Sequence, residues 1–347
     1  MRKLLPLIVL LVATPFVACE ASAKPWDSRC GNSGVALPDW IAGCTAMIDS
    51  GELRGRELSA AYAQRGHALT LTRDMTRAAD DLDRAVQADP SYVAAFVNRA
   101  NFFNVARKPE RALADANRAM ELDPNLPLVY FVRASAEAQL NNYDSAIADY
   151  SVVIKMRPNF AQTYGLRGVL YHKKGDDDRA IADYDERLNR ETDVGTLLNR
   201  GDARRNKKDY EGSGADYGEA IRLAPKNAGG YKGRCFIRLV TQDFKGAVED
   251  CDTAIKLDPN EAGVYVNRGS ALSMLGERQR ALADYDTAIT LEPGHPINHV
   301  SRAMVLSEMG DRSGALLSLR KALALAPGFP PALEQLEKIQ GKKQTSR

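Results

Sequence analysis

The sequence predicts an all-α solenoid of about eight helical hairpins, and three observations carry this prediction. Seven prolines recur at intervals of 34 residues, with a single interval of 67: Pro90, Pro124, Pro158, Pro225, Pro259, Pro293 and Pro327. A fixed period of this length is typical of a repeat array. Apolar residues at helical spacing precede each proline, which cannot continue a helix. Each period also holds small residues at fixed places, which let two helices approach closely.

Alignment on the prolines gives eight repeats over residues 59–329. They begin at Ser59, Val93, Pro127, Ala161, Val194, Ala228, Ala262 and Pro296. The fourth residue is aromatic in most repeats, and the eighth is small in all of them. The repeat from Ala161 to Asp193 is one residue short, lacks the closing proline and has Arg187 where most repeats have alanine. A bent or looser junction with the next repeat is therefore expected.

The segment YVNRGSALSMLGERQRALADYDTAITLEP, residues 265–293, carries an aromatic residue, Gly, Ala, Tyr, Ala and a closing Pro in order. In this pattern the chain resembles the tetratricopeptide repeat (TPR) proteins over about four-fifths of its length. The resemblance implies a right-handed superhelical solenoid. The opening PDWIAGCTAMIDSGELRGRELSAAYAQRG, residues 38–66, is similar to that of exported bacterial TPR proteins. Residues 24–58 are then a lead-in and capping half-repeat, and residues 330–347 are a capping helix and polar tail.

The first 23 residues predict an export signal. A short basic start precedes an apolar run from Leu4 to Val17, and a small-x-small cleavage site ends at Ala23. Cleavage there leaves a periplasmic or secreted protein. In the alternative, Cys19 is acylated as a lipoprotein cysteine and holds the chain on a membrane. A membrane is expected as a partner only in that second case.

Composition argues against nucleic acid as a partner. Charged residues make up 27% of the chain and are mixed in sign, and the formal net charge is +2. Nucleic-acid binding needs a marked basic excess on one face, and the sequence shows none.

Four cysteines follow the predicted signal, and an even number in an oxidising compartment favours disulfides. Cys235 and Cys251 occupy the eighth and twenty-fourth positions of one repeat, where its two helices are expected to face each other. This pair is therefore expected to be bonded, which leaves Cys30 and Cys44 as a local pair. The alternative is four buried free thiols that fill small-residue positions.

A charged series runs through the repeats. The seventh position is always arginine: Arg65, Arg99, Arg133, Arg167, Arg200, Arg234, Arg268 and Arg302. The twenty-third is Asp81, Asp115, Asp149, Asp183, Asp216, Asp250, Asp284 and, in the last repeat, Ser318. One interpretation is an anion-binding ladder, and the other is a structural ladder of exposed Arg–Asp pairs. The equally regular series of seven aspartates favours the second interpretation. Ser318, in a repeat without a successor, is a hint that each pair joins one repeat to the next. Gly43 at the matching position of the half-repeat weakens this hint, because it leaves Arg65 without such a partner.

Catalytic and metal-binding signals are weak. His295 and His299 have a spacing that can hold a metal on a helix, but Pro296 places His295 before the helix. The sequence contains no phosphate-binding loop, no Cys-x-x-Cys pair and no nucleophile with a suitably placed His and Asp. The prediction is a protein that is not an enzyme and holds no metal or cofactor.

The resemblance also implies a ligand site. TPR proteins usually bind peptides on a concave groove formed by the first helix of each hairpin, at its second, fifth, ninth and twelfth positions. The residues selected there are Asn101, Asn104, Phe131, His172, Asp202, Arg205, Lys232 and Phe236. Further residues at these positions are His67, Thr70, Ser135, Gln162, Ser270, Ser273, Met304 and Ser307. The asparagines suit an extended peptide backbone, and Arg205 and Lys232 suit an acidic group.

The predicted function is a non-catalytic scaffold of the periplasm or cell envelope that binds a protein or an extended peptide in this groove. The alternative is an accessory subunit that presents substrate to an envelope enzyme acting on polysaccharide or peptidoglycan.

Overall fold

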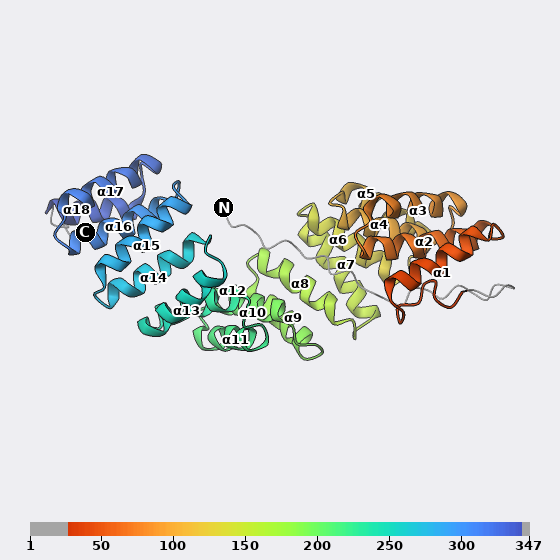
Figure 1. Cartoon of the computed structure of the whole chain (residues 1–347), viewed down its shortest axis with the longest axis horizontal. Coiled ribbons are helices and arrows are strands. Elements are labelled where there is room, and N and C mark those ends of the chain that lie inside the picture. Colours follow the sequence, from red (N-terminus) through yellow and green to blue (C-terminus); the bar gives the residue numbers. More distant parts are fainter. Residues whose placement is uncertain (1–26, 342–347) are drawn as a thin grey trace. The chain divides into compact units, whose positions relative to one another are not determined.

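The computed structural model describes residues 27–341, so the predicted signal, Cys19 and the last six residues lie outside the described part. Within residues 27–341 every regular element is a helix, as the all-α prediction requires (Figure 1). The chain divides into two compact bodies, the first ending at Asp176 and the second beginning at Asp177. They are called the N-terminal body and the C-terminal body here. None of the described helices has the length and apolar character needed to cross a bilayer.

The N-terminal body has three complete hairpins with a single helix on either side. The first helix is α1 (Leu37–Asp49) and the last is α8 (Ala161–Lys173). The hairpins are α2 (Gly55–Leu71) with α3 (Met75–Ala88), α4 (Val93–Val105) with α5 (Pro109–Leu122), and α6 (Pro127–Gln139) with α7 (Tyr143–Met156). Helix α1 lies where the capping half-repeat was expected, and it packs on α2.

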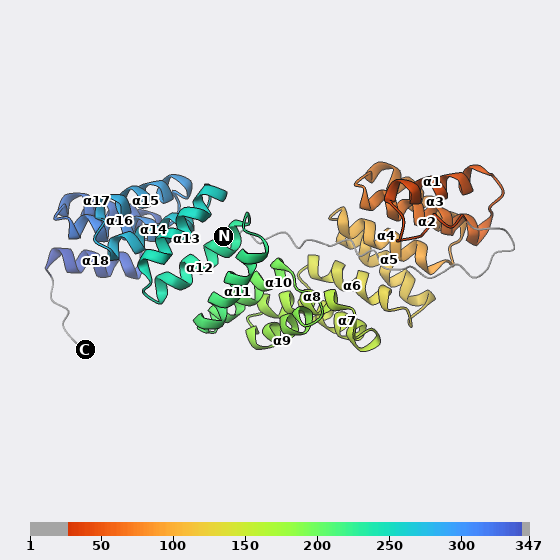
Figure 2. The same ribbon diagram turned by 60° about the horizontal axis from the view of Figure 1, so that its bottom comes forward.

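The C-terminal body begins with α9 (Asp177–Leu188) and ends with α18 (Pro330–Gln340). Four hairpins lie between them (Figure 2). They are α10 (Val194–Asn206) with α11 (Tyr210–Leu223), α12 (Ala228–Val240) with α13 (Phe244–Leu257), α14 (Ala262–Met274) with α15 (Arg278–Leu291), and α16 (Pro296–Glu308) with α17 (Arg312–Leu325).

The irregular repeat is where the two bodies divide, but not at the place expected. Its helices α8 and α9 belong to different bodies, so the division falls inside the repeat. The junction with the next repeat, where looseness was expected, is held by hydrogen bonds of a single side chain. The nearly buried Arg187 donates from Nε to Asp193 Oδ2 at 2.7 Å and to Thr196 Oγ1 at 3.0 Å. The side chain that replaces the usual alanine thus joins α9 to the start of α10.

The turn inside every repeat has the same backbone geometry. Its fifteenth residue has a positive φ of 57° to 83° and stops the first helix in the left-handed conformation. These residues are Arg73, Arg107, Asn141, Gly175, Lys208, Gln242, Gly276 and Gly310. The next residue caps the second helix in several repeats, where the side chains of Asp74, Asp209, Asp243 and Asp311 accept a backbone N–H.

The eighth and twenty-fourth positions face each other inside a hairpin, and their sizes are complementary. A Cβ on Gly66 would lie 2.7 Å from Leu82 Cγ, and one on Gly201 would lie 2.8 Å from Tyr217 Cε1. Hairpin α4–α5 has alanine at both positions, Ala100 and Ala116. Since protein interiors are close-packed, a large residue on one helix requires a small one opposite.

In hairpin α12–α13 the same two positions hold Cys235 and Cys251, which form a disulfide with Cα atoms 5.5 Å apart. Both side chains are fully buried. A second disulfide joins Cys30 to Cys44 with Cα atoms 4.6 Å apart. It ties the segment before α1 to that helix, next to the buried Trp40. The first is the pairing that the repeat register favours, and the second is the local pair that it leaves.

The charged series is structural, and its pairs lie within hairpins. In six hairpins the arginine donates through two nitrogens to the aspartate sixteen residues later, over 2.6 to 3.2 Å. The aspartate side chains are only 3–10% exposed. In the last hairpin Arg302 donates to Ser318. The expectations of exposed pairs and of pairs between successive repeats were therefore wrong, and these neutralised arginines do not form an anion ladder.

Successive hairpins are joined by a second carboxylate, the aspartate at the twenty-fifth position of a repeat, which pairs with the arginine of the following repeat. The same arginines use a remaining nitrogen to reach it, as in Arg99–Asp83 at 2.8 Å and Arg268–Asp252 at 2.6 Å. Arg200–Asp185 and Arg302–Asp286 repeat the contact, each at 2.6 Å. Arg65, which has no complete preceding repeat, donates to Thr45 of the capping helix α1.

One groove candidate, His67, is buried in the cap and is expected to make the protein sensitive to acid. Its ring lies 5.8 Å from the Trp40 ring, and burial lowers its pKa to about 4. Because an unfolded histidine titrates near 6.5, the unfolded chain binds more protons between pH 6.5 and 4, so stability falls as pH falls through this window. The free energy of unfolding is expected to fall by about 2 kcal/mol between pH 7 and pH 5.

Urea unfolding followed by tryptophan fluorescence measures this loss at the two pH values, since Trp40 packs on His67. His67→Leu removes the titrating group and should make the two unfolding curves more alike. An equally large pH dependence in the variant would assign the acid sensitivity to other groups.

Candidate functional site

In the N-terminal body, two of the selected groove residues are part of the packed interior. Asn104 is fully buried, donates to the Val132 carbonyl at 2.9 Å and accepts from Gln139 Nε2 at 3.1 Å. Phe131 is 6% exposed and packs edge-on against Tyr150. Neither side chain is available to a ligand, so these two predictions were wrong. Asn104 instead ties α4 to α6.

The other two selected residues of this body, Asn101 on α4 and His172 on α8, are half-buried. The additional candidates Thr70 and Ser135 are buried and bond to carbonyls of their own helices. The first helices of the N-terminal body therefore offer few accessible polar groups at the predicted positions.

The C-terminal body brings Asp202, Arg205 and Phe236 together with Tyr217, and these four residues are called the Asp202 cluster. Asp202 Oδ1 accepts from the Tyr217 hydroxyl at 2.9 Å and from Arg205 Nη2 at 2.8 Å. The Arg205 guanidinium lies over the Phe236 ring, 5.5 Å from its centroid. Three helices supply the cluster: α10 gives Asp202 and Arg205, α11 gives Tyr217 and α12 gives Phe236.

Tyr217 holds this arrangement in place. Its ring packs between two helices, because a Cβ on Gly201 would lie 2.8 Å from Cε1 and one on Gly233 would lie 2.4 Å from the same atom. Only glycine at these positions leaves room for the ring in its present place. Burial raises the pKa of Tyr217, with the negative charge of Asp202 as a further cause. The hydroxyl therefore stays protonated and donates to Asp202.

Asp202 is a local exception to a recurring contact. In hairpins α6–α7 and α14–α15 the ninth position is serine, and Ser135 and Ser270 bond to the hydroxyls of Tyr150 and Tyr285 at 3.0 and 3.1 Å. Asp202 makes the equivalent bond but has a second carboxylate oxygen. Among the described residues no hydrogen bond reaches Oδ2, although the carboxylate is paired with Arg205, and the side chain is 37% exposed. The cluster thus presents an unused acceptor beside an aromatic ring.

Lys232, the fourth selected residue of this body, lies on α12 and already has acidic neighbours. Its Nζ is 3.1 Å from Glu261 Oε2 and 3.9 Å from Asp258 Oδ2. Arg205 is likewise paired with Asp202. An acidic ligand group would therefore have to displace a carboxylate from either cation, so neither is a free anion site.

The ninth positions of α10, α12, α14 and α16 continue the cluster into a row. They hold Asp202, Phe236, Ser270 and Met304. Met304 is 43% exposed, and Phe236 and Ser270 are half-buried. These four residues are called the first-helix row. Within residues 27–341 no group of three or more His, Cys, Asp or Glu side chains could hold a metal ion.

Comparisons with known proteins agree with the repeat architecture. A family model described as TPR repeat matches residues 134–175, and one described as tetratricopeptide repeat matches residues 194–227 and 262–295. No curated protein matches the chain.

Several solved structures are similar to the chain at low sequence identity. The C-terminal part of a TPR repeat-containing protein from Cytophaga hutchinsonii has a TM-score of 0.56 and 20% identity, with 69% of this chain and 99% of that one covered. PilF of Pseudomonas aeruginosa has a TM-score of 0.53 and 18% identity, with 61% and 97% covered. In the APC/C hetero-tetramer Cut9–Hcn1, the matching chain has a TM-score of 0.54 and 12% identity, with 87% and 83% covered.

Proposed function

Because the chain is a tetratricopeptide repeat protein, we propose that it is a non-catalytic scaffold whose C-terminal body binds an extended peptide of a partner protein. The Asp202 cluster carries this proposal. Asp202 Oδ2 can accept an N–H from a peptide backbone, and the Phe236 ring beside it can pack on an apolar side chain. Met304 further along the first-helix row adds a flexible apolar contact.

The cluster is suited to binding because its residues are already held in position. Tyr217 is fixed between Gly201 and Gly233 and orients Asp202, while Arg205 rests on Phe236. A ligand therefore needs to order few protein side chains, which lowers the entropic cost of binding. The known assembly of Cut9 with Hcn1 in one hetero-tetramer is an example of a similar fold that associates with another chain.

We place this scaffold in the periplasm or cell envelope. The sequence of residues 1–23 supports export, and the two disulfides are compatible with an oxidising compartment. Cell fractionation combined with N-terminal sequencing tests this placement. A protein that begins at Lys24 in the periplasmic fraction supports it, whereas an intact N-terminus in the cytoplasm contradicts it.

Asp202→Ser is expected to weaken binding of the partner at least tenfold, or about 1.4 kcal/mol, without destabilising the fold. Serine is the residue that two other hairpins have at this position, where it still bonds to the tyrosine. The variant is therefore expected to keep the bond to the tyrosine and to remove the second acceptor, the charge and the ion pair with Arg205. Phe236→Ala should weaken binding by a similar factor, because it removes the ring on which Arg205 and the ligand rest.

The measurement is affinity capture from an envelope extract, followed by titration of the captured partner against each variant. Thr290→Ala, an exposed change on the second helix α15 and outside the groove positions, is the matched control and should bind as the native protein does. If both Asp202→Ser and Phe236→Ala bind the partner at native strength, the site lies elsewhere on the chain.

A further inference from the structure

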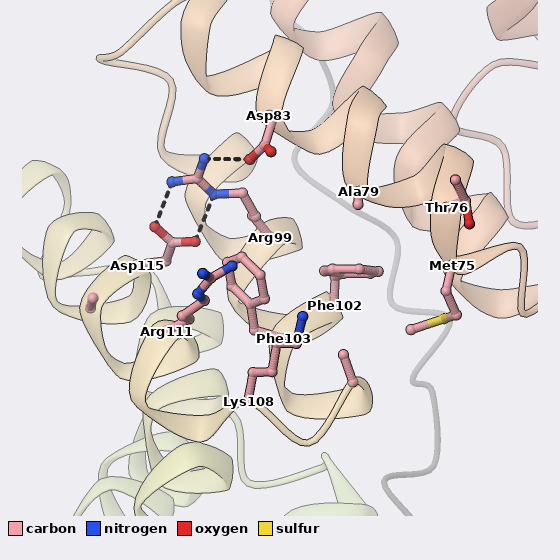
Figure 3. Close-up of a pocket in the computed structure, with 12 residues that line it drawn as sticks. Met75, Thr76, Ala79, Asp83, Arg99, Phe102, Phe103, Lys108, Arg111 and Asp115 are labelled. Atoms are coloured by element: carbon pink, nitrogen blue, oxygen red, sulfur yellow. Dashed lines mark hydrogen bonds and ion pairs between the residues drawn. The ribbon is translucent and has the colours of Figure 1, made fainter.

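A cleft of about 710 Å³ opens on the N-terminal body, between the second helices α3 and α5 and the end of α4 (Figure 3). Its apolar lining includes Met75, Ala79, Phe102, Phe103 and Ala106. It is called the Phe103 cleft here. No residue of the first-helix row belongs to it, and it lies in the other body. It is therefore a separate candidate from the site proposed above.

One position that lines the cleft is smaller in the first repeat than in most of the others, although Gly214 in the fifth repeat is smaller still. The twenty-first position is Ile147, Val248 and Leu282 in three other repeats, and each of these packs against a hydrophobic cluster. In the first repeat it is Ala79. The missing side-chain volume leaves the Phe103 ring half-buried beside an open space. Leucine at this position is thus compatible with the repeat and would occupy the part of the cleft beside Phe103.

The charges around the cleft are not balanced locally. Arg99 is held between Asp83 and Asp115, so these three groups satisfy one another (Figure 3). The remaining two cations are Lys108 and Arg111. Neither has a carboxylate within 4 Å among residues 27–341, and Arg111 stacks on Phe103 with its guanidinium 5.7 Å from the ring centroid. The five charged lining residues sum to +1, and the two cations without a carboxylate partner, Lys108 and Arg111, lie at the edge of an apolar surface.

We propose that the Phe103 cleft is a second docking site, which takes a peptide segment of a partner protein in which a large apolar side chain adjoins Asp or Glu. The apolar side chain occupies the space that Ala79 leaves open and contacts Phe102, Phe103 and Met75. The neighbouring carboxylate pairs with Arg111 and Lys108, whose charges it complements.

A side chain that projects from a peptide suits this cleft better than a free small molecule does. Several lining residues, including Thr76, Asp83, Lys108 and Ala114, are exposed, so the cleft stays open to solvent. Small-molecule sites bury most of the ligand surface, whereas a docked peptide needs only one side covered.

The test is fluorescence anisotropy of the purified full-length protein with an end-capped, fluorescein-labelled peptide, Ser-Glu-Phe-Glu-Ser. Two comparison peptides replace both Glu by Gln, or Phe by Ala. The acidic aromatic peptide is expected to bind at least about tenfold more tightly than either comparison peptide, because each of them lacks one of the two required groups. Equal binding of the Gln and Glu peptides, or no saturable binding of the Glu peptide, would overturn the proposal.

Three variants locate the bound peptide. Ala79→Leu should reduce binding more than tenfold by filling the space, and Arg111→Gln about tenfold by removing one charge. Arg111→Glu should reverse the preference, so that Ser-Lys-Phe-Lys-Ser binds more tightly than the acidic peptide. Because Arg111 is exposed, its variants report on binding even if Ala79→Leu perturbs the fold.

Phe236→Ala keeps this test separate from the function proposed above. The change lies on α12 of the C-terminal body and should leave binding of the acidic peptide unchanged. If Phe236→Ala weakens peptide binding while both Arg111 variants bind the peptide with native affinity, the peptide occupies the first-helix row and the Phe103 cleft is not a site.

Discussion

Arg133→Leu is expected to destabilise the N-terminal body by about 3 kcal/mol, because it leaves a buried carboxylate without its partner. Asp149 is 8% exposed in its side chain and accepts from Arg133 Nε and Nη2, both at 2.7 Å. An exposed pair would contribute only about 0 to 1 kcal/mol, so burial of the aspartate decides the size of the effect. Urea unfolding of the native protein and the variant measures it.

The double variant Arg133→Leu with Asp149→Ala is the control. Removing both charges also removes the cost of the unpaired carboxylate, so most of the lost stability should return. This pair is well suited to a double-mutant cycle, since Arg133 has no second carboxylate partner among the described residues. A loss below 1 kcal/mol in the single variant, or no recovery in the double one, would show that the pair does not depend on burial.

Loss of the Cys235–Cys251 bond is expected to cost roughly 3 kcal/mol, the value that the chain-entropy model gives for a loop of this size. The variant to use is Cys235→Ala with Cys251→Ala, because it reproduces the Ala100 and Ala116 pair of hairpin α4–α5. Its helices can therefore still pack closely, and the measured loss reports mainly on the missing cross-link.

Repeats contact only their neighbours, so this loss should be local. Hydrogen exchange should quicken in α12, α13 and their flanks, while α2 to α5 keep their protection. Non-reducing peptide mapping of the exported protein checks that the bond is present. Free thiols in that protein, or faster exchange throughout both bodies, would contradict this account.

The repeat register predicted the hairpins because it depends on local periodicity. It also placed Cys235 opposite Cys251, since equivalent positions of a hairpin face each other whatever the neighbouring repeats contain. The ion-pair ladder was predicted with the wrong connectivity. The prediction joined each aspartate to the arginine of the next repeat, as Asp81 to Arg99, whereas the structure joins it to the arginine of its own hairpin, as Arg65 to Asp81. An arginine inside the array lies between two acceptors, as Arg99 lies between Asp83 and Asp115, so the sequence alone could not show which contacts it makes.

The groove positions were less predictable because accessibility depends on neighbouring elements. Asn104 is covered through contacts with α6, and His67 lies under the capping helix, although both occupy positions that are accessible in the C-terminal body. Tyr217 was missed altogether. A signal was present, since tyrosine at the twenty-fourth position recurs beside a small eighth residue, and its hydroxyl reaches the ninth.

The joints between hairpins differ in how they would respond to mechanical pulling. Four of them have an aspartate at the twenty-fifth position that the next arginine binds. At two others the position holds Asn117 or Gly218, and the following Arg133 and Arg234 make ion pairs only within their own hairpins among the described residues. Under tension applied along the chain, each body therefore has one joint at which adjacent hairpins can separate without breaking an ion pair. Hairpins would be released in groups set by these joints rather than one by one from the ends.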